Sequence, residues 1–542
     1  MNYGIAWGVV VAFLVGYFIV GRRSSIKHIR GPPSPSWIFG NLLQFRLPRS
    51  YGDHEFKWLK TYGPVYRLRG CFGGNRLMVS DLLACQYILK SQHFTVSPTF
   101  EALLHLVIGD GNLLGIRREI HHRLRKNFNM ALIAVAVRRY EPVFQKAAQA
   151  ITHKLELSDG ASIDIVPLLT AAIMTAIAEA ALGYSMDELG EEYVAASTEI
   201  LSGSWNSPLR GSYRFRAVSS IQTAGHILTD AIGVYLPKWL LRAAVRLPTN
   251  TFKAARKTIR LARQIGAQVV REKQDLAQQG VDINGDVFGT LREKIFPPLA
   301  LNSAGLMMTL NRSVDPVHSD GMRSRLTGQG LVTQTQTIMA AGQETTTKTI
   351  ALGLWELAKD PKFQEMLRAE IHSSLGEAGH RNGTYDEMPL LNAFIKETLR
   401  FYPAEAFTER IVVHDTVIPL SESITTSTGE QMSQIPVTKG QIVIVGIASY
   451  QRLESRWGAD ADKFRPSRWL DGSILNADPV GPYTNLWRFA ILEMQAVICE
   501  LVGKFAFAVP ENDSVRVCMA NTLQPVLSSG ERGVLLRVTR LG

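Results

Sequence analysis

The stretch Thr335–Pro361, TQTIMAAGQETTTKTIALGLWELAKDP, decides the fold class that this sequence predicts, because it is the centre of a long helical candidate, Val332–Lys359. Gly342 lies inside this helix, where glycine costs about 1 kcal/mol relative to alanine. Glu344 and Thr345 follow, and a helical threonine can bond back to the carbonyl four residues earlier. These residues favour a groove or bulge that admits a small ligand, with an acid–hydroxyl pair able to relay protons. A surface helix with an incidental glycine is the alternative.

The rest of the body, from about residue 50, is also mostly helix-compatible. Four further long helical candidates are Ala147–Leu157, Ala171–Leu182, Phe252–Gln278 and Pro361–Leu375. Short β-like runs are Val65–Leu68, Arg76–Val79, Ile411–Val413 and Ile442–Ile447. The polar segments Ser158–Asp164 and Ser421–Lys439 are expected to be loops. No repeat and no dividing linker is evident, so the prediction is a single large domain, mainly α with small β-sheets.

The composition is that of an ordinary globular chain. Of 542 residues, 46% are apolar and 20% charged, which excludes wholesale disorder, collagen and a protein with many membrane spans. Lysine and arginine number 59 against 48 acidic residues, a net charge of +11 that suits an anionic partner such as a membrane surface. The four cysteines form neither a disulfide scaffold nor a CxxC zinc motif, and indicate a reducing compartment; they are Cys71, Cys85, Cys499 and Cys518.

The N-terminus predicts a membrane anchor. Residues 1–21 carry no charged side chain, and the run Gly4–Val20 spans roughly 26 Å as a helix, about the thickness of a bilayer core. A cleaved signal peptide would need a charged start and a small-residue cleavage site, which are absent. The basic residues that follow place the body in the cytosol. We expect an anchor over residues 1–21, a basic, proline-rich hinge over 22–40 and a catalytic body over 41–542.

Three further motifs contain arginines. Glu397 and Arg400 lie three residues apart in KETLR, so they share a helix face and can pair. Arg468, in FRPSRW, could join them, because a buried ion pair needs further partners. The cluster HHRLRK begins at His121 and includes Arg125; lipid and nucleic acid are both conceivable contacts, but poor interleaving with aromatic residues disfavours nucleic acid. Each motif alone also fits an ordinary surface or loop.

The order of these features is more specific than any one of them. An apolar anchor, a proline elbow, HxRxR, AGxETT, ExxR and FxPxRW follow one another, and this resembles the cytochrome P-450 family, more narrowly its fungal, membrane-bound microsomal type. The segments Thr335–Pro361, Tyr385–Arg410 and Ile447–Gly472 strengthen the resemblance. It implies the cytochrome P-450 fold and an oxidoreductase. Such a monooxygenase binds haem b through a cysteine thiolate, takes electrons from an NADPH-cytochrome reductase and uses O₂.

The resemblance also implies roles for individual residues. The acid–alcohol pair that delivers protons is matched by Glu344 and Thr345, and the glycine of the oxygen groove by Gly342. The structural triad of the family is matched by Glu397, Arg400 and Arg468. The arginines that meet the haem propionates are matched by Arg125 and Arg410. The place where the family often has tryptophan, another propionate contact, is occupied by His121.

The same resemblance implies a location and a class of substrate. The chain would be a single-pass protein of the endoplasmic reticulum membrane, with the lipid bilayer as a partner, no nucleic acid, and a cytosolic catalytic domain. Substrate contacts are expected around Ser97–Gly115 and Thr408–Val413, which are mostly apolar. A hydrophobic small molecule, such as a terpenoid or another product of secondary metabolism, is therefore the expected substrate.

One departure from the family concerns the iron ligand. The family carries a glycine-rich loop with the axial cysteine before its last long helix, but here Trp487 is followed directly by Arg488, so about a dozen residues are absent. Cys499 lies 11 positions after Arg488, roughly 16 Å along a helix axis, which is too far to replace the loop. No other cysteine lies in a glycine turn or at a helix N-terminus. The sequence thus predicts no axial ligand.

A second departure is an insertion, residues 293–310, where the family usually runs straight on. Eighteen codons are about the length of a short fungal intron, so our hypothesis is a gene model with one retained intron and one lost exon piece. The sequence leaves three functions open. These are a monooxygenase whose native form carries the missing loop, a catalytically dead remnant of the family, and a basic membrane-surface interaction protein.

Overall fold

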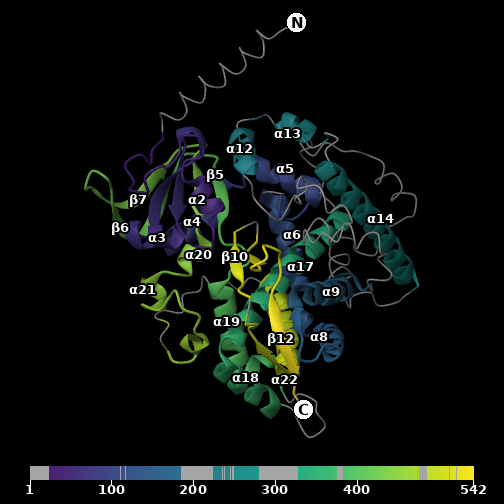
Figure 1. Ribbon diagram of the computed structural model, residues 1–542. Coiled ribbons are helices and arrows are strands. Elements are labelled where there is room, and N and C mark those ends of the chain that lie inside the picture. Colours follow the sequence, from purple (N-terminus) through teal and green to yellow (C-terminus); the bar gives the residue numbers. More distant parts are fainter. Residues whose placement is uncertain are drawn as a thin grey trace.

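The computed structural model describes residues 24–541 of the chain except for 110, 116–117, 185–223, 235, 237, 245, 247–249, 280–327, 375–382, 473, 475–484, 512 and 520–521. A helical part gathered around α17 (Gly328–Ala358) lies beside a smaller part built on a five-stranded sheet (Figure 1). The prediction of a mainly α fold with small sheets is therefore confirmed.

The described helices include all five long helical candidates of the sequence. They are α2 (Leu42–Arg46), α3 (Glu55–Tyr62), α4 (Leu82–Lys90), α5 (Pro98–Val107), α6 (Arg118–Ala131), α7 (Ala134–Arg138), α8 (Glu141–Glu156), α9 (Ile165–Ile177), α12 (Ala224–Gly233), α13 (Lys238–Ala244), α14 (Asn250–Gln278), α17, α18 (Pro361–Ser373), α19 (Pro389–Phe401), α20 (Ile447–Tyr450), α21 (Glu454–Trp457) and α22 (Asn485–Lys504). Local chemistry sets several boundaries. At α18, for example, Asp360 Oδ1 accepts from the Phe363 N–H at 3.0 Å and Pro361 takes the first helical position.

The helical core forms where five of these helices pack together. α17 packs against α9 and α14, and α22 packs against α8. Side chains buried between them belong to one continuous apolar cluster, which includes Ile173 and Ile177 of α9, Ile350 of α17, and Val497 and Leu501 of α22. Fully burying one such side chain contributes about 1.5–3 kcal/mol, so this core supplies the main stabilisation of the helical part.

The strands form four small sheets. The strands are β1 (Val65–Arg69), β2 (Asn75–Val79), β3 (Phe94–Thr95), β4 (Ser162–Asp164), β5 (Thr408–Val412), β6 (Thr416–Thr425), β7 (Gln431–Val437), β8 (Ile442–Val445), β9 (Phe505–Ala508), β10 (Arg516–Cys518), β11 (Gln524–Val526) and β12 (Leu535–Arg540). The largest sheet has the order β1-β2-β8-β5-β3, and its β2–β8 pair is parallel, with Arg76 opposite Ile442. The others are β4-β12-β9, β10-β11 and β6-β7.

Two expected loops contain strands, so these predictions were wrong in part. Ser421–Lys439 holds the end of β6 and all of β7, and Ser158–Asp164 holds β4. The β6–β7 hairpin buries Ile418 and Ile435, which face each other in register, together with Leu420 and Val437, while residues 421–423 and 433–434 are polar and exposed. Polar composition suggested a loop, but a hairpin needs only one apolar face to pack on its neighbours.

A buried ion cluster joins the five-stranded sheet to neighbouring helices. Glu409 of β5 accepts from Arg46 at 2.5 Å and from Arg76 at 2.6 Å, and Asp230 of α12 lies 3.4 Å from Arg46. Burial alone would raise the pKa of Glu409, but the charges and hydrogen bonds of the two arginines hold it at about 2. The cluster therefore fixes the orientation of β5 beside Arg410.

The predicted membrane and hinge segments are placed only in part. One described helical run, Ile165–Leu182, is long and apolar enough to cross a membrane, but 61% of it is buried and it belongs to the core. The expected anchor, residues 1–21, and the insertion, residues 293–310, lie outside the described residues. Within the hinge, Ile26 and Ile29 are fully buried against the sheet, and the Arg67 N–H donates to Arg30 O at 2.8 Å. The described part of the hinge is thus packed onto β1.

Candidate functional site

Gly342 and Thr345 lie on α17 in regular helical geometry. The helix runs without interruption from Gly328 to Ala358, so the bulge that we expected at Gly342 is not formed. Thr345 Oγ1 donates to Ala341 O at 2.7 Å, which is the predicted back-bonding. A Cβ at Gly342 would lie 2.7 Å from Ile177 Cδ1 of α9. In this structure the glycine therefore allows close packing of two helices.

Replacing Gly342 with alanine tests this packing role. The extra methyl overpacks the α9–α17 contact at a cost of about 1–3 kcal/mol, while the better helix propensity of alanine returns about 1 kcal/mol. We expect a net loss of up to about 2 kcal/mol in the free energy of unfolding, measured by chemical denaturation. In an Ile177→Val background, which lacks the clashing Cδ1, the same substitution should become neutral or stabilising. An equal loss in both backgrounds would contradict the packing role.

Glu344, the acid of the pair, is held by side chains from its own helix and from the β10–β11 hairpin. Lys348, one turn further along α17, forms an ion pair and hydrogen bond with Glu344 Oε1. Gln524 of β11 donates to the same oxygen at 3.2 Å. Lys348 Nζ also donates to Thr522 Oγ1 at 3.2 Å. Thr345 bonds to the α17 backbone instead, so the acid and the alcohol have separate hydrogen-bond partners.

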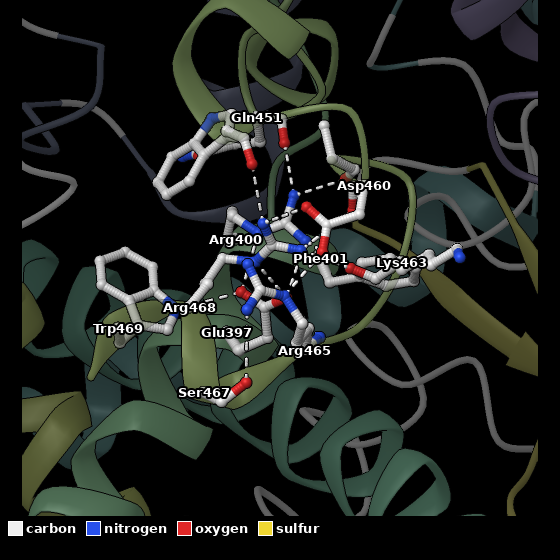
Figure 2. Close-up of polar contacts among 12 residues, drawn as sticks. Glu397, Arg400, Phe401, Gln451, Asp460, Lys463, Arg465, Ser467, Arg468 and Trp469 are labelled. Carbon is white, nitrogen blue, oxygen red and sulfur yellow. Dashed lines mark hydrogen bonds and ion pairs between the residues drawn. The ribbon is translucent and has the colours of Figure 1, made fainter. Parts of the chain in front are cut away.

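Glu397, Arg400 and Arg468 meet as the sequence predicts (Figure 2). Glu397 is fully buried and accepts two hydrogen bonds at 2.8 Å from Arg400 and one at 3.0 Å from Arg468 Nε. The Trp469 indole N–H at 3.0 Å and the Arg465 backbone N–H at 2.7 Å complete the set. Burial by itself would raise the pKa of Glu397, but these donors and charges hold it below its usual value.

The two arginines also organise the loop between α21 and the turn at Pro466–Trp469. Arg400 Nη1 donates to Gln451 O at 2.7 Å and to Ala461 O at 2.8 Å. Arg468 donates to Trp457 O at 2.8 Å and to Asp460 O at 3.0 Å (Figure 2). A buried guanidinium thus satisfies backbone carbonyls that would otherwise lose their hydrogen bonds. The network fixes an irregular loop onto α19 and has no free group for chemistry.

The residues expected at the haem propionates lie on two elements. His121 is exposed and Arg125 half-buried, one turn apart on α6. Partial burial and the charges of Arg125 and His122 lower the pKa of His121. Arg410 of β5 donates to Thr408 Oγ1 at 2.7 Å and to Glu409 O at 2.9 Å. Within the described part of the chain, no hydrogen bond or ion pair joins Arg410 to His121 or Arg125.

The haem that the resemblance implies needs an axial thiolate, and the donors present do not fit it. α22 begins at Asn485 and continues as a helix through Trp487 and Arg488, with no intervening turn. Cys499 of this helix packs against the apolar core. Among the described residues, no group of three or more histidine, cysteine or acidic side chains could hold a metal ion. The cations expected at the propionates are described, but none of the four cysteines in the described part of the chain lies near the start of α22.

Two buried groups of the site region were missed by sequence reasoning. Lys348 follows Glu344 by four residues, a spacing that signals a helical ion pair, but its burial depends on the distant β10–β11 hairpin. Glu493 of α22 is 1% exposed, and no charged group among the described residues offsets the burial of its carboxyl group. Burial raises the pKa of Glu493 to about 8, opposed only by the Thr346 hydroxyl. No local signal distinguishes such a glutamate from an exposed one.

Comparison with known proteins agrees with the mainly helical fold. The family model Cytochrome P450 matches residues 30–484. Cytochrome P450 monooxygenase 81 and Cytochrome P450 monooxygenase 91 of Postia placenta are each 27% identical to this chain, covering 92% and 99% of it and 91% and 97% of their own lengths. Cytochrome P450 monooxygenase claO of Ampulloclitocybe clavipes is 28% identical over 91% of this chain and 88% of its own length. The chain belongs to the cytochrome P450 family of haem-using oxidoreductases.

Proposed function

We propose that the native form of this protein is a membrane-anchored haem-thiolate monooxygenase that oxidises a hydrophobic small molecule of secondary metabolism, such as a terpenoid. Its electrons would come from an NADPH-cytochrome reductase and its oxygen from O₂. The observation that carries the proposal is that the residues that match the family's motifs ahead of the missing loop are present and held in place. Glu344 and Thr345 lie on α17, and the Glu397 network is closed.

The missing loop lies between Trp487 and Arg488. The family match ends at residue 484, three residues before this junction, while relatives align with 88–97% of their own lengths. This supports a local loss within an otherwise full-length family member. When bound, the haem would supply oxygen activation. The chain itself would hold a proton at Glu344 and position a hydroxyl at Thr345, in the roles that the family resemblance implies.

The continuous helix across the junction favours a second function for the polypeptide as it stands. α22 extends from Asn485 to Lys504 with no space for a cysteine loop. Such a chain would keep the fold but not the family's chemistry, because removing an axial thiolate abolishes oxygen activation rather than tuning it. A catalytically inactive relative is therefore the alternative to an incomplete gene model.

The carbon monoxide difference spectrum of the reduced protein separates these functions. The full chain as it stands should lack the Soret band of a thiolate-ligated ferrous haem. Inserting the corresponding loop of Cytochrome P450 monooxygenase 91 between Trp487 and Arg488 should produce that band. The matched control carries the same loop with serine in place of its cysteine and should lose the band again. No band in the loop-restored, folded protein would overturn the monooxygenase proposal, and sequencing of the transcript would show whether the native junction contains the loop.

The proposed anchor predicts a change in membrane association. Deleting residues 1–21 should move most of the protein from the pelleted membrane fraction to the supernatant, because the apolar run of Gly4–Val20 is long enough to span a bilayer. Immunoblotting of fractionated fungal cells would measure this shift. A matched variant with Arg22→Lys and Arg23→Lys, which keeps the apolar run and its flanking charge, should stay with the endoplasmic reticulum membranes. If the truncated chain also remained fully membrane-bound after a high-salt wash, residues 1–21 would not be the anchor.

A further inference from the structure

Lys348 is a buried cation whose contacts converge on the acid of α17. Its side chain is 9% exposed and that of Glu344 10%, and the two form an ion pair across one helical turn. A charge so far from water is costly unless it is paired and hydrogen-bonded. An exposed pair at the same spacing contributes only a few tenths of a kcal/mol. Burial therefore makes the Glu344–Lys348 pair an element of the site rather than a surface feature.

The β10–β11 hairpin closes this pair from the other side. Thr522, in the connection between the two strands, accepts from Lys348 Nζ at 3.2 Å. Gln524 of β11, 2% exposed, donates to Glu344 Oε1 at 3.2 Å and to Thr522 Oγ1 at 2.8 Å. The four side chains thus form a closed ring of hydrogen bonds between α17 and the hairpin. Any movement of the hairpin away from α17 must break this ring.

We propose that Lys348 is a positioning residue for Glu344: together with Thr522 and Gln524 it holds the carboxylate in place on the hairpin side of α17. The inference rests on the proposed function, which gives Glu344 its role in proton transfer. In this arrangement Lys348 and Gln524 both contact Glu344 Oε1, so this oxygen can take part in proton transfer only after those contacts loosen. The hairpin thereby controls when Oε1 becomes available.

The charges around Lys348 are consistent with this role. Burial lowers the pKa of Lys348 to about 8, while the charge and hydrogen bond of Glu344 oppose the shift and Arg532 adds to it. Near neutral pH the ammonium is thus the form present in the folded protein. Since Lys348 is held so close to losing its proton, small movements of Glu344 or the hairpin alter its charge.

A double-mutant cycle on the full chain tests the contact without any haem. Lys348→Met and Glu344→Gln should each lower the folded-to-unfolded ratio. In the double variant this ratio should be about tenfold higher than the product of the two single losses would give. The matched control is the exposed pair Lys60 and Glu454, 3.5 Å apart, whose side chains are 57% and 54% exposed. Lys60→Met and Glu454→Gln should show little coupling. Additive losses for the Lys348 cycle would overturn the proposal.

The pH dependence of product formation tests the positioning role in the loop-restored protein. Lys348→Met removes the positive charge that contacts Glu344, so it should move the acidic limb of the pH–rate profile. Lys348→Arg should keep the limb near its original position. A merely structural lysine would lower the amount of folded enzyme and leave the profile where it was, and that result would overturn the proposal. A failed thiolate spectrum would instead refute the proposed function, and the double-mutant cycle would still report on the contact.

Discussion

Replacing Glu397 with glutamine should destabilise the folded protein by about 3–5 kcal/mol. Glu397 is the only carboxylate that contacts Arg400 and Arg468 together within the described network, and both arginines are at most 2% exposed. An amide cannot balance two buried guanidinium charges, and it replaces one acceptor oxygen by a donor that would face the Arg465 or Trp469 N–H. Chemical denaturation followed by tryptophan fluorescence would measure the loss.

An exposed pair provides the control for this prediction. Lys60 lies 3.5 Å from Glu454, and the two side chains are 57% and 54% exposed. Glu454→Gln should therefore change the free energy of unfolding by no more than about 1 kcal/mol. If Glu397→Gln cost as little as Glu454→Gln, the network would not stabilise the loop between α21 and the Pro466–Trp469 turn. The two variants change one carboxylate each, so they differ in burial and not in chemistry.

The parent protein should lose stability as the pH rises from about 4.5 to 8, and replacing Glu493 with glutamine should remove this loss. The folded-state pKa of about 8 lies above the ordinary value of 4.5, so the folded state binds the Glu493 proton more tightly than the unfolded state does. Stability from this group is complete below about pH 4.5 and declines as pH rises through 8. At about 1.4 kcal/mol per pKa unit, the decline amounts to at most about 5 kcal/mol. Glutamine has no proton to lose, so the variant should be more stable than the parent near pH 8.5.

Melting temperatures between pH 5.5 and 8.5 would measure this effect. The informative quantity is the difference in melting temperature between variant and parent at each pH, because the other titratable groups contribute equally in both proteins. Glu55 is a suitable second site, since burial raises its pKa to about 7 but Ser449 donates a hydrogen bond to it. Glu55→Gln should show a smaller total change, which is complete at a lower pH, near 7. A pH-independent difference for Glu493→Gln would mean that Glu493 is paired or solvated in the folded state.

Sequence reasoning predicted the parts of the fold that repeat a pattern locally. The long helices followed from periodic apolar residues, as for Phe252–Gln278, which agrees with α14 to within two residues at its start. The Glu397–Arg400 pair followed from i,i+3 spacing on one helix, and Arg468 was added by the family resemblance. The β6–β7 hairpin was missed because its polar residues outnumber the apolar ones that pair across it.

The rest of the site depends on contacts that no local pattern encodes. Gln524 and Glu344 are separated by 180 residues along the chain, and Lys348 and Thr522 by 174. Periodicity says which face of α17 is apolar, but not which distant hairpin covers it. The prediction of a bulge at Gly342 was wrong. A glycine within a helix can permit either a distortion of the helix or a close contact with another helix, and only the position of Ile177 on α9 shows that the second applies here.

The parallel pairing of β2 with β8 has a consequence for synthesis on the ribosome. Arg76 lies opposite Ile442, 366 residues later. At about 5–20 residues per second, β1 and β2 leave the ribosome roughly 20 to 70 s before their central partner exists. During that interval an apolar strand edge, including Leu77 and Val79, is open to other chains. Nascent protein should therefore depend on chaperones that shield this hairpin until the last third of the chain arrives.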